Sequence, residues 1–370
     1  MFFTQQLCAL DFSGSGREDN CSQDEARFYE SGYESELTNN SPQVVLSDEV
    51  QQFRNTLETD TLTLSSSVLD YQYENGRRYH AFRQGTYMHP NDENNQLDIF
   101  HHVYMLLLNG ELYRAPIGPA PERILDIGTG TGIWAIDMAE QFPNAQIIGT
   151  VYADLSPIQP SWIPPNVQFE LDDAESEWTF EHDHFDFIHV RCLLGAISDW
   201  PRLFAQAYKA LKPGGWIEVV EFHFPSTSDD GSLNESTAWW KCERLLLKAY
   251  AVSNRSLMIA RSIRKWLVDV GFEQTSDVQV KTPVGGSWCT DPREKEVGRW
   301  NAVNVMEGLE GFTMAPLHRV LEWSPIEVQA LLGQVRTELL EQKVHGYFVT
   351  HFVIGQKPTG PTTATRTREL

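Results

Sequence analysis

Residues 123–134 read RILDIGTGTGIW, and this stretch decides the fold. Its apolar first part is typical of a parallel strand that is covered on both faces. Three glycines then alternate with other residues, at Gly128, Gly130 and Gly132. Because glycine has no Cβ atom, such a segment can turn tightly and let a ligand approach the backbone. The stretch therefore predicts a strand, a glycine turn and the first turn of a helix.

The spacing of the glycines indicates which ligand the turn accepts. A dinucleotide-binding turn needs glycine or alanine at the sixth position of G-x-G-x-x-G, and this chain has Ile133 there. Asp126 lies two residues before the first glycine, where a carboxylate aimed into the turn would repel a pyrophosphate but hold an ammonium group. Replacing Asp126 with alanine is therefore expected to abolish binding without unfolding the protein. The predicted ligand contacts in this stretch are Asp126, Gly128, Thr129, Gly130 and Gly132; an ordinary strand-to-helix turn is the structural alternative.

The glycine turn begins an alternation of strands and helices. Strands are expected at residues 124–127, 146–153, 167–171, 185–191, 216–222, 275–282 and 347–354. This pattern predicts an α/β fold with a doubly wound, mostly parallel, seven-stranded, Rossmann-like sheet. We expect the last strand to lie beside the fifth as an edge strand.

Acidic residues follow two of these strands. Asp154 follows strand 146–153 at close to the usual distance of about 20 residues from the glycine turn, where an acid accepts hydrogen bonds from ribose hydroxyls. Asp172 and Asp173 follow strand 167–171, where a carboxylate can accept the exocyclic amine of adenine. Turn formation is the alternative role for Asp172 and Asp173.

The segments before the first strand differ in composition. Residues 1–48 are rich in Ser, Asn, Gln and acidic residues, which cannot bury enough apolar surface to offset the entropy of ordering. They predict a disordered acidic tail, either merely solvated or used as a docking arm. Residues 49–115 predict a helical lid in which Tyr79 and Tyr87 contact the cofactor. The alternative is that the aromatic residues of this segment only pack against the sheet.

The remaining chain is predicted to be one catalytic domain and a short tail. The domain covers residues 116–357, and residues 225–257 interrupt its strand–helix rhythm. An insertion over the carboxyl ends of parallel strands is where a substrate pocket would form. Residues 358–370 are rich in Thr, Pro and Gly and predict a flexible tail.

Charge and cysteine usage exclude several classes of function. A net charge of −22 argues against direct binding of nucleic acid or an anionic membrane, but not against a protein partner. The five cysteines are odd in number, scattered and without metal-ligand spacing, which fits a reducing compartment and no metal site. No apolar run reaches the length of a membrane span, and the first residues lack a secretory signal. These features predict an intracellular protein, cytoplasmic or nuclear.

Several phrases in register resemble the fungal LaeA-like family of S-adenosylmethionine-dependent methyltransferases, which are class I methyltransferases. They lie at residues 74–80 (ENGRRYH), 126–132 (DIGTGTG), 154–160 (DLSPIQP), 172–173 (DD), 199–201 (DWP) and 211–216 (LKPGGW). The resemblance covers about residues 65–357 and implies S-adenosylmethionine as the methyl donor and a role in secondary metabolism. Some members methylate small molecules, and others are nuclear regulators of metabolite gene clusters. The chain departs from the family at residues 151–153, an insertion before Asp154. A β-bulge would absorb it; otherwise it would displace Asp154 from the ribose and weaken cofactor binding.

Methyl transfer from a sulfonium is an in-line displacement, so the protein mainly has to position and desolvate the reactants. A general base is needed only if the acceptor is a protonated hydroxyl, phenol or amine. The candidates are His223, Glu221 and His189, each with a structural role as the alternative. Three hypotheses for the function follow: the protein is a methyltransferase of small molecules, a regulator that binds S-adenosylmethionine and works through protein partners, or a degenerate fold that binds no cofactor.

Overall fold

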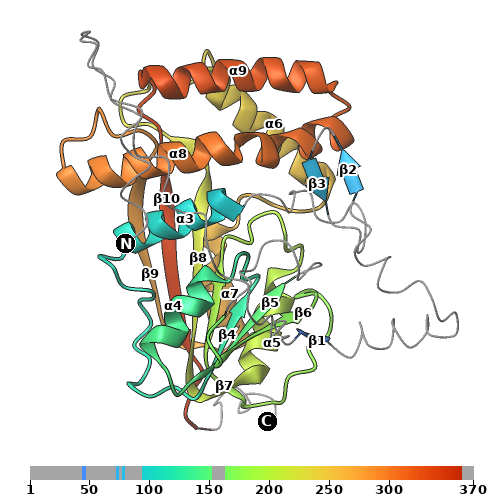
Figure 1. Ribbon diagram of the computed structural model, residues 1–370, viewed down its shortest axis with the longest axis vertical. Helices are drawn as coiled ribbons and strands as arrows, with labels where there is room; N and C mark the ends of the chain where they lie inside the picture. Colours follow the sequence, from blue (N-terminus) through green and yellow to red (C-terminus); the bar gives the residue numbers. More distant parts are fainter. Residues whose placement is uncertain (1–43, 47–71, 75–76, 80–93, 152–162, 361–370) are drawn as a thin grey trace, which may run out of the picture. The chain divides into compact units, whose positions relative to one another are not determined.

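The computed structural model describes residues 44–46, 72–74, 77–79, 94–151 and 163–360. Within them an eight-stranded sheet has the strand order β1-β6-β5-β4-β7-β8-β10-β9 (Figure 1). Its strands are β1 Val44–Leu46, β4 Arg123–Ile127, β5 Gln146–Val151, β6 Val167–Leu171, β7 Phe185–Arg191, β8 Leu211–Thr227, β9 Glu273–Pro283 and β10 Tyr347–Gln356. A separate hairpin joins β2 Gln72–Glu74 to β3 Arg77–Tyr79. The seven predicted strands are all present, and β1 adds an eighth from the segment predicted as a tail.

The sheet is parallel from β1 to β8 and antiparallel at β10 and β9. The prediction that the last strand lies at the edge is wrong, because β10 pairs with both β8 and β9. Residues 350–353 of β10 are all buried, as a central position requires. β9 is half-exposed and carries charged residues such as Asp277 and Lys281, which suit an edge strand because they discourage pairing with another chain.

The described part of the chain also contains seven α-helices. They are α3 Asn94–Leu107, α4 Ile133–Gln141, α5 Trp200–Ala210, α6 Ala238–Val252, α7 Ile263–Val270, α8 Pro292–Ala315 and α9 Pro325–Glu341. Their starts follow the sequence closely. Asp199 caps α5 by accepting from the backbone N–H of Arg202, and Ser324 and Glu327 form a reciprocal capping box at α9.

The central strands bury both of their faces, as predicted for a parallel sheet. Ile124 packs with Trp134 and Met138 of α4 on one face. Its neighbour Leu125 packs on the other face with Phe204 of α5. This alternation is the two-residue period of a strand, and it fixes the end of β4 and the glycine turn between two packed layers.

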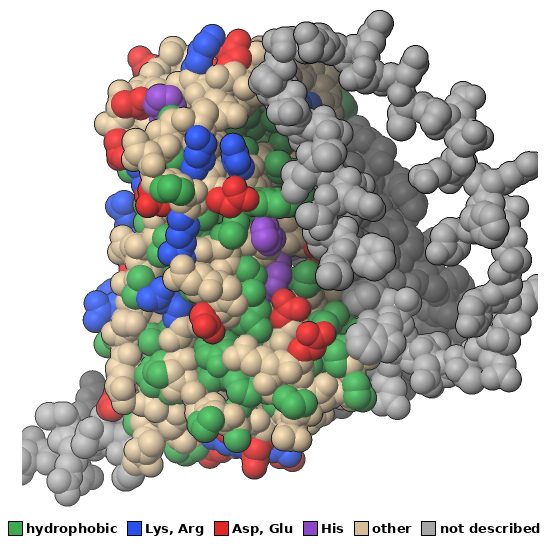
Figure 2. Space-filling model, turned by 60° about the vertical axis from the view of Figure 1, so that its left-hand side comes forward, with side chains coloured by type: hydrophobic (Ala, Val, Ile, Leu, Met, Phe, Trp, Pro, Cys, Tyr) green, Lys and Arg blue, Asp and Glu red, His purple; other side chains and the backbone are tan. Residues whose placement is uncertain are grey.

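The carboxyl ends of the parallel strands face α3 and, beyond it, α6, α8 and α9 (Figure 1). α6 comes from the predicted insertion at residues 225–257, whereas α8 and α9 follow β9. Among the described residues, no helix is both long and apolar enough to cross a bilayer. Figure 2 shows one face of the molecule, where Lys and Arg side chains are interspersed with Asp and Glu side chains.

Candidate active site

A cavity of about 340 Å³ lies at the carboxyl ends of the strands, between the glycine turn, α3 and the helices α6, α8 and α9. Its volume is in the range of small-molecule sites. Its cofactor-side wall includes Gly128, Thr129, Gly130, Thr131, Thr150, Val151, Asp172 and Asp173. Its other wall is largely apolar and includes Phe222, Phe224, Trp239, Leu246, Leu309, Phe312, Val335 and Phe348. The cavity therefore joins the predicted cofactor turn to the predicted substrate insertion.

The three glycines of the turn all have positive φ angles, of 69° at Gly128, 60° at Gly130 and 81° at Gly132. Gly128 and Gly130 line the cavity, as predicted. Gly132 does not, and its role is packing: a Cβ there would lie 2.2 Å from Cζ of Phe169 on β6. The turn thus presents bare backbone to the cavity at its first two glycines and lets α4 approach the sheet at the third.

Asp126 lies beneath the turn and does not point into the cavity. Its Oδ2 accepts from the Thr129 hydroxyl at 2.5 Å, and its Oδ1 lies 2.7 Å from Nδ1 of His189. Asp126 is buried and is not part of the cavity wall. This geometry argues against the predicted direct contact with an ammonium group, because both carboxylate oxygens already have partners. Asp126 instead orients Thr129, which does line the cavity.

His189 supports Asp126 from the neighbouring strand β7. Its ring stacks on Trp134 with centroids 3.8 Å apart and planes 7° from parallel. Burial lowers the pKa of His189, although Asp126 raises it in part. A neutral imidazole sealed in this way is a positioning group, so the structure favours the structural alternative over a catalytic base for His189.

Asp172 and Asp173 lie at the end of β6, in the cavity wall, and both are buried. The backbone N–H of Asp172 donates to Val151 at 3.0 Å, which joins the ends of β5 and β6. The carboxylate of Asp173 accepts from the backbone N–H of Glu175 at 2.9 Å and from the Ser176 hydroxyl at 3.3 Å. Asp173 thus has the predicted turn role, and contact of either acid with adenine stays a prediction.

The helix α3 covers the glycine turn as a lid would. The hydroxyl of Thr131 donates to Oδ1 of Asp98 at 2.8 Å, and a Cβ at Gly130 would lie 3.4 Å from Cδ1 of Leu97. The other end of α3 is held by α8, where Nη2 of Arg293 donates to the carbonyl oxygen of Leu107 at 2.8 Å. α3 is therefore held to the glycine turn at one end and to α8 at the other, and its role as a lid stays a prediction.

Other predicted residues of the site lie outside the described residues. They are Tyr87, Asp154 and the side chain of Tyr79, together with positions 152 and 153 of the insertion. The backbone of Tyr79 belongs to the β2–β3 hairpin. Glu74 of this hairpin accepts from Nε of Arg319 at 2.8 Å, which fixes the hairpin to the short π-helix η3 Pro316–Val320 that follows α8.

The two remaining candidate bases do not line the cavity. Burial raises the pKa of Glu221 to about 8, and its Oε1 accepts from the backbone N–H of Leu193 at 2.6 Å. His223 is partly exposed, and burial together with Arg261 and His351 lowers its pKa. Both residues lie on β8 outside the cavity wall, which argues against a catalytic role.

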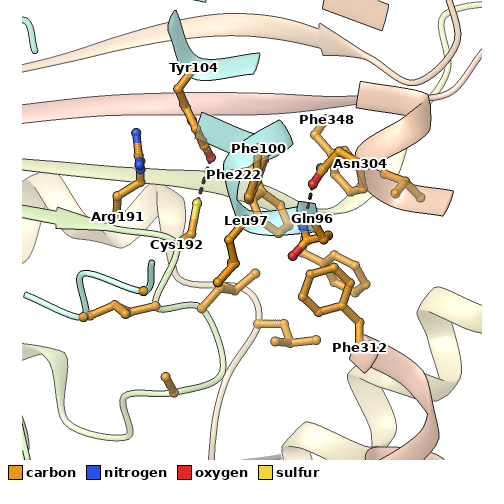
Figure 3. A pocket seen from close by; sticks show the side chains of 18 of the residues that line it. Gln96, Leu97, Phe100, Tyr104, Arg191, Cys192, Phe222, Asn304, Phe312 and Phe348 are labelled. Atoms are coloured by element: carbon orange, nitrogen blue, oxygen red, sulfur yellow. Dashed lines mark hydrogen bonds between the residues drawn. The ribbon is translucent and has the colours of Figure 1, made fainter. Parts of the chain in front are cut away.

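A tyrosine–cysteine pair in the wall was not predicted from the sequence. The hydroxyl of Tyr104 lies 2.9 Å from Sγ of Cys192, and the guanidinium of Arg191 lies 5.0 Å from the centroid of the tyrosine ring (Figure 3). Burial raises the pKa of both Tyr104 and Cys192. Both groups are therefore neutral near pH 7, and the wall carries a thiol and not a thiolate at this point.

Buried amide side chains in the wall were also missed. Gln96 on α3 and Asn301 and Asn304 on α8 all line the cavity and are 2–4% exposed. One signal could have found Gln96: it lies four and eight positions before Phe100 and Tyr104, on the apolar face of the predicted helix. Asn301 and Asn304 give no such signal, since amides three positions apart are common on solvated helix faces.

Known proteins similar to this chain are methyltransferases and regulators of fungal secondary metabolism. A family profile described as "Methyltransferase domain" matches residues 100–277. Methyltransferase pytC of Aspergillus terreus is 45% identical over 82% of this chain and 93% of its own length. Secondary metabolism regulator LAE1 of Cochliobolus heterostrophus is 39% identical over 77% of this chain and 94% of its own. Protein-methionine methyltransferase laeA of Emericella nidulans is 37% identical over 78% of this chain and 77% of its own.

Proposed function

Because the chain belongs to the fungal LaeA-like family of S-adenosylmethionine-dependent methyltransferases, we propose that it methylates a small molecule of secondary metabolism. Its activity is methyl transfer, and S-adenosylmethionine is its cofactor. One observation carries the choice of acceptor. The cavity continues from the glycine turn into a chamber whose wall is mainly aromatic and aliphatic, as an enclosed small-molecule site requires.

The residues around the glycine turn fit the cofactor. The backbone at Gly128 and Gly130 borders the cavity, and a Cβ at Gly130 would project toward Leu97 of the lid. We expect the turn to hold the amino-acid portion, and Asp172 at the end of β6 to hold the adenosine portion. When bound there, S-adenosylmethionine supplies a methyl group on a positively charged sulfur that is a good leaving group.

The chain's own contribution is to orient the reactants and exclude water. Leu97, Phe100 and Phe222 form an apolar surface beside the turn (Figure 3). Cys192 lies in the same wall as a neutral thiol, because burial raises its pKa. A thiol is a far weaker nucleophile than a thiolate, so Cys192 does not compete with the acceptor for the methyl group. This supports transfer to a bound molecule over modification of the wall itself.

A second candidate function is regulation through protein partners. Two relatives that cover more than three quarters of this chain are named a regulator of secondary metabolism and a protein-methionine methyltransferase. The acidic segment at residues 1–48 would then be the docking arm. In either case we propose a cytoplasmic or nuclear location, which is supported by the free thiols of Cys192, Cys242 and Cys289.

An experiment with a labelled methyl group on the cofactor distinguishes the two functions. We would incubate the full chain with radiolabelled S-adenosylmethionine and a fresh extract of the source organism, and then separate small metabolites from protein. The proposed function predicts label on a small metabolite. Label on protein alone would contradict it and support the regulatory function. Gly128→Val serves as the inactive control, because a β-branched residue is disfavoured at a φ of 69° and would distort a turn whose backbone lines the cavity.

A further inference from the structure

One buried side-chain atom of a residue that lines the cavity has no hydrogen-bond partner within the described part of the chain. It is Oε1 of Gln96, on a side chain that is 3% exposed. The amide nitrogen of the same side chain donates to Oδ1 of Asn304 at 2.6 Å. A buried acceptor without a donor is uncommon in native proteins, and each such atom calls for an explanation.

The orientation of the Gln96 amide follows from a chain of hydrogen bonds that ends on the backbone. Nδ2 of Asn301 donates to the carbonyl oxygen of Pro283 at 2.9 Å, and a carbonyl oxygen can only accept. Oδ1 of Asn301 therefore faces Asn304 and accepts from its Nδ2 at 3.1 Å. Oδ1 of Asn304 must then face Gln96, which leaves the amide nitrogen of Gln96 as the donor and its Oε1 as the open acceptor. The assignment of oxygen and nitrogen is thus fixed by the network and not by choice.

Aromatic side chains lie near the amide of Gln96. In Figure 3, Gln96 lies between Asn304 and Phe312, with Phe348 nearby, and these residues all line the cavity. Leu97 lies on the side of the glycine turn, since it is the residue that a Cβ at Gly130 would approach. Gln96 therefore lines the part of the cavity between α3 and α8, beyond the cofactor turn, and its Oε1 is a buried acceptor behind this wall.

We propose that Oε1 of Gln96 accepts a hydrogen bond from an N–H or O–H group of the methyl acceptor. This inference rests on the proposed small-molecule function and adds a substrate class to it: a mostly apolar, ring-containing molecule that carries at least one hydrogen-bond donor. The relay through Asn304 and Asn301 holds the oxygen in place, so an analogue without the donor would leave it unpaired and bind more weakly.

Matched probes test this inference without knowledge of the natural acceptor. The probes are 2-naphthol, which has a hydroxyl donor, and 2-methoxynaphthalene, which has none. Their dissociation constants are measured by calorimetry on the full chain saturated with S-adenosylhomocysteine. We expect the wild type to bind 2-naphthol about tenfold more tightly than 2-methoxynaphthalene, as one buried hydrogen bond predicts.

Substitutions then locate the preference. Gln96→Leu should reduce the ratio of the two dissociation constants to about one. If the leucine variant does not fold, Gln96→Met, whose side chain has a similar length to glutamine, should give the same result. Gln141→Leu is the matched control, because Gln141 is an exposed glutamine of α4 outside the cavity wall, and it should keep the tenfold ratio. Binding of S-adenosylhomocysteine should stay within about twofold in all variants.

Each other outcome counts against the inference. A ratio that stays at tenfold in Gln96→Met assigns the donor contact to another residue. Loss of S-adenosylhomocysteine binding in that variant means that Gln96 serves the cofactor. Wild-type binding of both probes with equal affinity refutes the contact but leaves the small-molecule function standing, whereas failure of the labelled-methyl experiment refutes that function independently.

Discussion

The hydroxyl of Thr131 donates a hydrogen bond to Oδ1 of Asp98 at 2.8 Å, and this contact joins the glycine turn to the helix that covers it. Asp98 lies on α3 and Thr131 lies in the turn between β4 and α4. Thr131 lines the cavity, and Asp98 follows Leu97, which also lines it. The contact therefore couples the position of α3 to the shape of the glycine turn.

Breaking this contact should weaken cofactor binding more than it weakens the fold. We expect Asp98→Ala and Thr131→Val each to raise the dissociation constant of S-adenosylmethionine by about three- to tenfold, because one hydrogen bond to a carboxylate is lost. Calorimetric titration measures the effect. The double variant should be no worse than either single variant, since the two side chains act as one unit. Fully additive losses would show that the two residues act independently.

Gly132, the third glycine of the turn, should tolerate a side chain less well than Gly110, which has a similar positive φ angle. Gly132→Ala adds a Cβ 2.2 Å from the ring of Phe169 at a positive φ, and we expect it to cost more than about 3 kcal/mol of unfolding free energy. Gly110→Ala also has a positive φ but no atom within 4 Å of the new Cβ, so it should cost only about 1 kcal/mol.

Chemical denaturation of the two variants tests this difference. Gly132→Ala should cost less in a Phe169→Leu background, where the ring is gone, than in the wild type. Equal costs for Gly132→Ala and Gly110→Ala would show that packing against Phe169 is not the reason for glycine at this position.

Asp126 should contribute to stability as well as to binding, contrary to the expectation from sequence. Asp126→Ala leaves the Thr129 hydroxyl and Nδ1 of His189 without their buried partner, so we expect a loss of about 2–4 kcal/mol along with weaker cofactor binding. Asp126→Asn retains an acceptor for Thr129 and should be milder. Thermal unfolding and titration with S-adenosylmethionine report the two effects. Loss of binding at an unchanged melting temperature would support the original expectation that Asp126 contacts the ligand directly.

Stability should fall as the pH rises from about 5 to about 8, partly because of Glu221. Burial raises its pKa from 4.5 to about 8 in the folded state, so between these values the folded chain binds more protons than the unfolded chain. The free energy of unfolding therefore decreases with rising pH, and the contribution of Glu221 is lost as the pH rises through its folded-state pKa. Glu221→Gln is neutral at every pH and should flatten this slope. Burial also raises the pKa values of Glu218 and Glu243 to about 7, so part of the slope of stability against pH should remain in the Glu221→Gln variant.

Denaturation curves at pH 6 and pH 9 measure the slope. The wild type should lose more stability between these values than Glu221→Gln does. Identical losses in the two proteins would show that Glu221 is already ionised in the folded state at pH 6.

Local signals predicted most of the fold. Strand β4 and the glycine turn follow from a buried apolar run and three glycines, and the capping box of α9 follows from the short polar motif at residues 324–327. The position of β10 could not be read in this way. Its place between β8 and β9 depends on pairing between segments far apart in the chain, and nothing local distinguishes an inner strand from an edge strand of similar composition.

The site was predictable where backbone conformation dictates residue type and not where side chains meet. Gly128 and Gly130 line the cavity, as expected. The turn was predictable because its positive φ angles favour glycine, which leaves a visible pattern in the sequence. The partners of Asp126 were not predictable, because Thr129 is local but His189 comes from another strand. The amide relay from Gln96 to Asn301 joins two helices that are distant in sequence, so only the folded structure brings it together.

The most direct test of the account is a calorimetric titration of the folded wild-type chain with S-adenosylmethionine. If the cavity beside Gly128 and Gly130 is the cofactor site, the titration should show one molecule bound per chain, and Gly128→Val should abolish the signal while circular dichroism remains that of a folded protein. A flat trace from the folded wild type, or unchanged binding in Gly128→Val, would contradict the account.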